Sequence, residues 1–191
     1  SREAALAVTD ARLVDLIGLL NKSLLRQVAP GWYAMHSLVC RFAGEQLRLM
    51  PDGEEAAMAR LAAYFLHFVA MRERVWNGPT PQQARGDIQP VMENVRLAWQ
   101  WAVQHHAWES LDDALFGLVA YYRSEGLYAE TLEVLRQLAG PLQDLPDLAE
   151  DQARLLAKAL SYQAAIRMRL DMKADAGLGI TEIAIEIGRA S

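Results

Sequence analysis

His36 is the residue whose type and position could most directly do chemistry. It stands in Met35-His36-Ser37, between a β-rich run and a helical run. An imidazole between a strand and a helix N-terminus can donate a hydrogen bond to an anionic oxygen, and nearby backbone N–H groups reinforce that bond. The pattern favours an anion-sensing histidine. The alternative is a structural histidine that is satisfied within the fold.

Other reactive groups do not form recognisable patterns. His67 has no partner at metal-ligand spacing, and the adjacent His105 and His106 point to different helix faces. Cys40 is the only cysteine, which excludes an internal disulfide and a cysteine-rich zinc site. The sequence contains neither a G-x-x-x-x-G-K-[ST] phosphate loop nor a G-x-S-x-G nucleophile elbow. We therefore expect no metal site and no catalytic residue, so this chain is not expected to be an enzyme.

The elements around His36 must place it at the end of a strand. Leu13, Leu16, Ile17 and Leu20 share one helix face, and two β-rich runs flank the turn signal Ala29-Pro30-Gly31. Helical periodicity returns after Ser37, which is the expected N-cap. This order of helix, hairpin and helix predicts a winged-helix domain over residues 1–50.

The rest of the chain is expected to be helical. Residues 51–108 form a linking helical region, in which one helix runs from Asp52 to Trp76, Asn77–Pro81 breaks it, and a second helix reaches His105. Residues 109–191 are expected to form tetratricopeptide-like repeats that begin a longer array, with turns near Gly126 and Asp171. The third repeat-region helix carries Leu156, Leu160, Gln163, Ala164 and Ile166, and Ile180, Ile183 and Ile187 mark the last helix. The predicted fold class is mainly α, a winged helix with one small β-hairpin followed by a superhelical array of α-helical hairpins.

Two stretches resemble a known family. The first stretch resembles the winged-helix segment of STAND ATPases, which are signalling NTPases related to NB-ARC proteins. It consists of the strings N-K-S-L-L, W-Y-A-M-H-S-L-V and F-A-G-E-Q-L. E-N-V-R-L-A-W-Q-W-A resembles the run that follows this segment in bacterial STAND regulators, with Asn94, Arg96 and Trp101 at matching positions. The resemblance implies that His36 senses the phosphate of ADP, although Ser37 stands where the family has aspartate.

The resemblance also implies a role for the whole chain. It would be the regulatory part of a cytoplasmic signal-transduction ATPase that controls transcription, with ADP or ATP bound only in the full-length protein. Its partners would be an upstream nucleotide-binding domain of the same chain, a protein or small-molecule inducer at the repeats, and further copies on activation. The alternative is a helical-repeat scaffold that binds proteins without nucleotide.

The charge and hydropathy of the chain argue against two classes of partner, DNA and a membrane. The net charge is −5, and Glu45 interrupts the basic residues around the hairpin and the following helix, so DNA contact is not expected. Charged residues break every apolar run before the ~18 residues that a membrane-spanning helix needs. We therefore expect neither DNA nor a membrane as a partner.

Large apolar side chains are expected to join the first two segments. Phe65, Phe68 and Trp76 on one helix and Trp99 and Trp101 on the next offer more apolar surface than either helix can bury by itself. Asn94 and Arg96 lie on the same later helix, and these residues define an interdomain junction that is expected to be packed and rigid. In the alternatives, the tryptophans only fill a helical core, or a flexible tether separates two independent domains.

Overall fold

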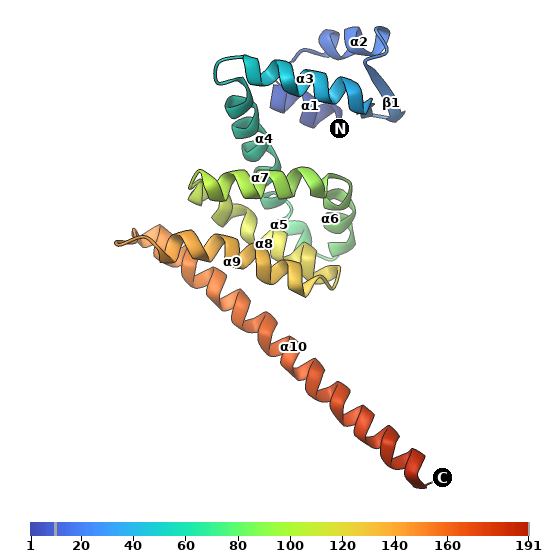
Figure 1. Ribbon diagram of the computed structural model, residues 1–191, viewed down its shortest axis with the longest axis vertical. Coiled ribbons are helices and arrows are strands. Elements are labelled where there is room, and N and C mark those ends of the chain that lie inside the picture. Colours follow the sequence, from blue (N-terminus) through green and yellow to red (C-terminus); the bar gives the residue numbers. More distant parts are fainter. Residues whose placement is uncertain (10, 191) are drawn as a thin grey trace. The chain divides into compact units, whose positions relative to one another are not determined.

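The computed structural model describes the backbone of residues 1–9 and 11–190 and the side chains of residues 1–9 and 11–171. The chain is mainly helical, with one small antiparallel hairpin among the described residues, which confirms the predicted fold class (Figure 1). It divides into two compact units, Ser1–Tyr121 and Tyr122–Ser191. The predicted segments 1–50 and 51–108 both lie in the first unit.

The N-terminal part contains the predicted order of helix, hairpin and helix. After α1 (Arg2–Thr9) come α2 (Leu13–Asn21), β1 (Leu25–Ala29), β2 (Trp32–Met35) and α3 (Ser37–Leu49). The strands pair from Leu25↔Met35 to Ala29↔Trp32, and the register shifts between Gln27 and Ala29. Gly31 makes the turn at a φ of 74°, in the left-handed region that glycine adopts at little cost. We call residues 13–49 the helix–hairpin–helix segment.

The linking region has more breaks than predicted. The expected long helix ends at Ala70 as α4 (Gly53–Ala70), and α5 (Glu73–Trp76) follows it. The predicted break after Trp76 is present, but Pro81 then starts an additional helix, α6 (Pro81–Ile88). A 3-10 turn, η1 (Gln89–Val91), leads into α7 (Met92–Gln104). Proline at the first helical position was the signal for α6, since its fixed φ suits that position.

Similar turns end α7 and α8 (Trp108–Ser124). At the end of α8, Gly126 has a φ of 72° and the N–H of Leu127 donates to the carbonyl oxygen of Tyr122 at 2.9 Å. At the end of α7, His106 has a φ of 56° and the N–H of Ala107 donates to Ala102 O at 2.9 Å. These hydrogen bonds satisfy carbonyl groups that a helix end leaves without partners. The turn predicted at Gly126 is confirmed.

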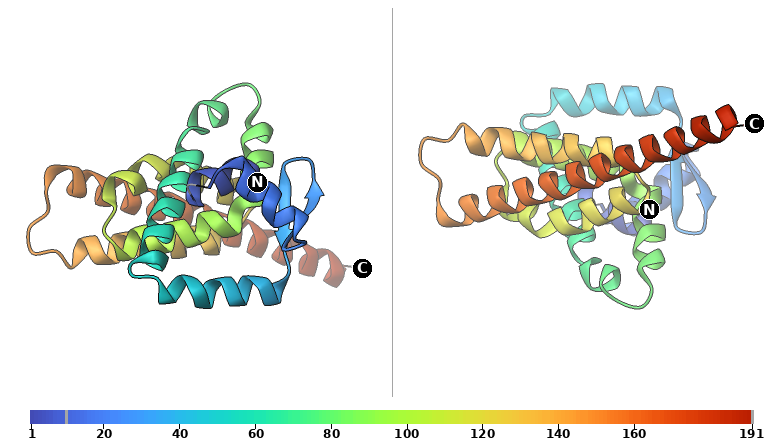
Figure 2. Two further views of the ribbon diagram at one scale, coloured as in Figure 1. Left: turned by 90° about the horizontal axis from the view of Figure 1, so that it is seen from above. Right: turned by 90° about the horizontal axis from the view of Figure 1, so that it is seen from below.

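The second unit contains α9 (Tyr128–Gln143) and α10 (Glu150–Ala190), which lie side by side (Figures 1 and 2). The turn predicted near Asp171 is wrong, because α10 continues through that residue. The predicted inner face is shifted by one residue at two positions: Leu155 and Ala159 are buried, whereas Leu156 is half-buried and Leu160 is exposed. Ile166 is buried as predicted. Ile180, Ile183 and Ile187 lie outside the residues whose side chains the structure describes.

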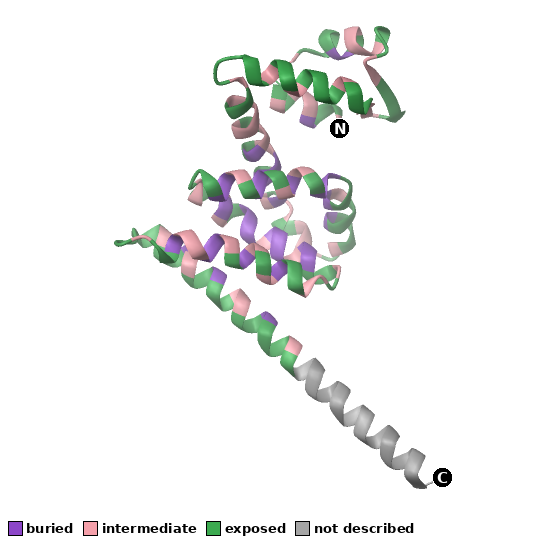
Figure 3. Cartoon of the chain, in the orientation of Figure 1, coloured by how far each residue is buried: buried purple, intermediate pink, exposed green. Residues whose placement is uncertain are grey.

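The core of the first unit lies where α4 packs on α7. Phe65, Val69, Val95 and Trp99 are buried there (Figure 3). Gly117 of α8 also approaches α4 closely: a Cβ at this position would lie 2.8 Å from Cγ1 and 2.9 Å from the carbonyl oxygen of Val69. A side chain at position 117 would therefore push directly against the α4 backbone.

Gly117→Ala is expected to lower the free energy of unfolding by about 1–3 kcal/mol, because the added methyl group overpacks the contact between α8 and Val69. Gly86→Ala on α6 is the matched control, since nothing lies within 4 Å of its Cβ position and alanine favours a helix. Urea unfolding monitored by circular dichroism measures both. Equal stability of the two variants would contradict a close approach at Gly117.

Candidate functional site

His36 lies where the sequence places it, between β2 and α3. Its φ of −65° and ψ of 141° are extended, and its ring Nδ1 accepts a hydrogen bond from the N–H of Leu38 at 3.3 Å. His36 is therefore the N-cap of α3, and the predicted cap, Ser37, is instead the first residue of the helix. Serine is a common N-cap, but the imidazole reaches the second helical N–H and takes that place.

The cap determines how His36 can act. Because Nδ1 accepts a hydrogen bond, the proton of a neutral ring must sit on Nε2. The side chain is exposed, so Nε2–H can donate to a group outside the chain. The positive end of the α3 dipole lies beside it and favours a negative group there. The arrangement can hold one anionic oxygen.

Among the described residues, no three His, Cys, Asp or Glu side chains gather closely enough to hold a metal ion. In the same part of the chain, no helix combines the length and apolar character needed to cross a bilayer. The feature that the described residues show at His36 is a hydrogen-bond donor beside a helix N-terminus.

Many large apolar side chains of the same segment are exposed. In α3, all of whose side chains the structure describes, none is buried, and Phe42 and Leu38 are 62% and 64% exposed. The helix–hairpin–helix segment and the residue after it leave these large apolar side chains exposed: Leu13, Val14, Ile17, Val28, Leu38, Phe42, Leu49 and Met50. Large exposed apolar surface marks interaction sites when it is contiguous. We call these eight residues the exposed apolar set.

Nearby arginines of α3 already have acidic neighbours. Arg41 Nε lies 3.8 Å from Glu45 Oε1, and Arg48 Nε lies 3.5 Å from Glu54 Oε2. Both pairs are exposed, so each contributes little to stability, but each offsets a positive charge that a phosphate backbone would need. The absence of DNA contact stays a prediction.

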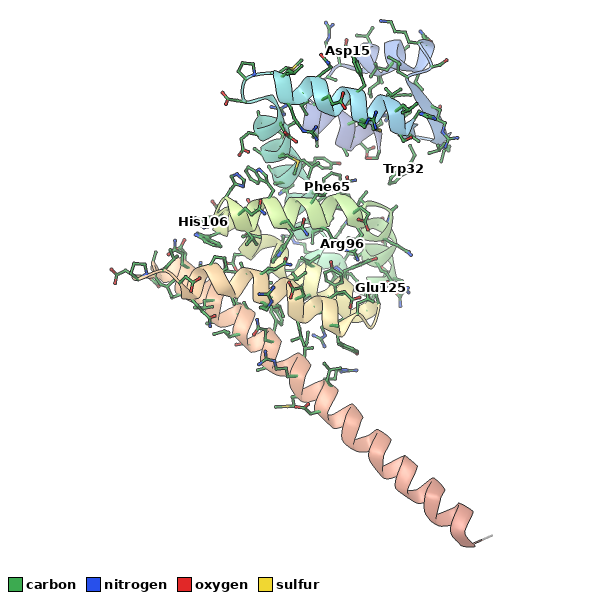
Figure 4. All side chains as sticks on the ribbon, in the orientation of Figure 1. Asp15, Trp32, Phe65, Arg96, His106 and Glu125 are labelled. Atoms are coloured by element: carbon green, nitrogen blue, oxygen red, sulfur yellow. The ribbon has the colours of Figure 1, made fainter. Side chains whose placement is uncertain are left out.

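Of the five residues predicted to form the interdomain junction, one is fully buried and four are partly buried. Trp99 is 1% exposed, whereas Trp76, Asn94, Arg96 and Trp101 are only partly buried. Arg96 Nη1 donates to Glu93 Oε1 at 2.6 Å on the same helix. The predicted packing between the helices of Phe65 and Trp99 is confirmed, since α4 and α7 bury both residues (Figure 4). Its rigidity stays a prediction.

An aromatic and charged contact joins the end of α7 to the start of α4. The His105 ring stacks on Trp101 with centroids 4.1 Å apart, and its Nε2 lies 3.0 Å from Glu55 Oε1. Its Nδ1 lies 2.8 Å from the carbonyl oxygen of Trp101, so both ring nitrogens face acceptors. Trp101 therefore stacks on His105 in this contact, in addition to lying at the edge of the core.

Sequence analysis missed a second connection, at Arg72. Its guanidinium carbon lies 3.2 Å from the Phe68 ring centroid, Nη1 donates to Phe68 O at 2.7 Å, and Nε lies 3.2 Å from Asp87 Oδ2. Burial lowers the pKa of Arg72, and the carboxylate of Asp87 opposes that shift. Arg72 thus ties the end of α4 to α6. The spacing Phe68-x-x-x-Arg72 was the available signal.

Trp99→Ala is expected to lower the free energy of unfolding by about 3–5 kcal/mol, because it removes a fully buried ring from the contact between α4 and α7. Trp99→Phe should cost clearly less, since it keeps an aromatic ring and removes a buried indole N–H that has no partner among the described residues. Urea unfolding measures both values. A loss below about 1 kcal/mol for Trp99→Ala would contradict the packed junction.

Comparison of this chain with protein-family models, with curated proteins and with solved structures finds no match. The functional assignment therefore rests on the residues and on their geometry: an outward donor at His36, the exposed apolar set of the same segment, and the packed crossing of α4 and α7.

Proposed function

We propose that this chain is the regulatory region of a STAND-type signal-transduction ATPase. The helix–hairpin–helix segment senses the nucleotide bound by an upstream domain of the same chain, and the following helices receive an inducer or protein partner. The full-length protein acts in the cytoplasm and controls transcription. ADP or ATP belongs to that full-length protein, and this region carries no catalytic step of its own.

The observation that carries the proposal is the hydrogen-bonded state of His36. Its Nδ1 accepts from Leu38 N–H, so Nε2–H of the exposed ring is left to act as a donor just after β2. A phosphate oxygen is a suitable acceptor, because its negative charge also interacts favourably with the N-terminus of α3. This geometry agrees with the sensor role that the family resemblance implies.

The exposed apolar set supports a domain partner for the same segment. Eight large apolar side chains of this segment and the residue after it are exposed, while Leu16 is the only buried residue of α2. An upstream nucleotide-binding domain that packs on this surface would remove apolar area from water, at about 25 cal/mol per Å². That domain would also bring the nucleotide phosphates to His36.

ADP retention by the full-length protein tests the proposal. His36→Ala should weaken ADP binding roughly 10- to 100-fold, because it removes one hydrogen bond to a charged group. His36→Asp should weaken it at least as much, since aspartate still caps α3 but repels the phosphate. His67→Ala on α4 is the control, because this exposed histidine lies outside the segment. Isothermal titration with ADP measures all three.

Unchanged ADP affinity in His36→Asp would contradict the sensor role. If His36→Ala weakens binding and His36→Asp does not, the capping of α3 matters and the imidazole does not. If the full-length protein contains no nucleotide-binding domain, the chain is better described as a protein-binding helical scaffold. In that case His36 is the structural histidine that caps α3.

A further inference from the structure

The connection between α3 and α4 consists of three residues with little conformational freedom. Met50 has a φ of −81° and a ψ of 129°, which is the extended conformation that a following proline requires. Pro51 fixes its own φ, and Asp52 adopts a φ of 55° and a ψ of 9° in the left-handed region. These three residues form what we call the elbow.

The two helices touch at the elbow through their backbones. A Cβ at Gly53 would lie 2.8 Å from Cβ of Met50 and 2.9 Å from the carbonyl oxygen of Leu47. Met50 N–H donates to Leu47 O at 3.2 Å, and Gly53 N–H donates to Met50 O at 3.1 Å. The first residue of α4 therefore sits directly against the last turn of α3, and only glycine fits there.

The same helix α4 is held along its length by other elements of the first unit. Arg60 Nε donates to the carbonyl oxygen of Val8 at 2.6 Å and so caps the end of α1. Further along, Val69 meets Gly117, and Phe65 is buried in the contact with α7. Any displacement of α7 or α8 would therefore act on α4 first.

We propose that the elbow is a rigid joint, so that α3 and α4 move as one body. Pro51 fixes its own φ and keeps Met50 extended, and the absence of space at Gly53 blocks the closing motion that a hinge would need. A shift of α4 thus carries α3, with His36 and the apolar residues Leu38 and Phe42, by the same rotation. This inference does not depend on nucleotide sensing.

Distance measurement between two spin labels tests the joint in the 191-residue chain. Cys40 is the only cysteine and is exposed on α3, so it accepts one label without other changes. Ala63→Cys provides the second label at an exposed position of α4. Double electron–electron resonance should show one narrow distance distribution. A broad or multiple distribution in the otherwise unchanged chain would overturn the proposal.

Variants of the elbow show whether the elbow itself, or contacts elsewhere, fixes the orientation of α3. Gly53→Ala should shift and broaden the distribution, whereas Gly44→Ala on α3 should leave it unchanged, since nothing lies within 4 Å of that Cβ position. Asp52→Gly should keep the narrow distribution and raise the melting temperature, because glycine adopts the left-handed conformation without strain.

A further variant covers the case in which Gly53→Ala does not fold, as judged by circular dichroism. Inserting two glycines between Pro51 and Asp52 keeps both helices and removes the tight turn, so the distribution should broaden. If the insertion leaves the distribution unchanged, contacts elsewhere orient α3 and the proposal is wrong. Unchanged distances in a folded Gly53→Ala variant would lead to the same conclusion.

Discussion

The packing of α4 against α7 is the contact on which the rest of the first unit depends. It buries Phe65, Val69 and Trp99. Because Gly117 has no side chain, the backbone of α8 can lie directly against Val69 of α4. Close-packed helices shift between discrete arrangements rather than bending gradually, because interdigitated side chains resist compression. The contacts of α4 with α1, α3 and α7 make it the element that can couple the N-terminal segment to the helices that follow.

The polar contacts that accompany the packing of α4 on α7 lie near the two ends of α4 rather than at its centre. Glu55 meets His105 where α4 begins and α7 ends, and Arg72 joins the end of α4 to Asp87 of α6. Each pair is at least partly exposed, so each contributes little free energy beside the buried aromatic packing. Their value is directional, since polar pairs at both ends favour one orientation of α4 among those that apolar packing would allow.

The helix–hairpin–helix segment differs from the packed contact of α4 and α7, because many of its large apolar side chains are exposed. Its order was predicted from sequence, and His36 stands at the predicted position, yet α3 buries none of its side chains. A segment with ordered backbone and an uncovered apolar surface is suited to reversible packing, because a partner gains area without unfolding it. The exposed donor at His36 and these exposed side chains are the features on which the proposed contact with an upstream domain rests.

The sequence by itself determined the order of helix, hairpin and helix in residues 13–49, the glycine turns at Gly31 and Gly126, and the position of His36, because prolines, glycines and capping residues act within a few positions of the chain. Tertiary structure decided where α4 ends, since Arg72 contacts Asp87 far along the sequence. It also decided which face of α10 is buried. Leu155 and Leu156 are adjacent and equally apolar, so only packing against α9 could select Leu155 for the inner face.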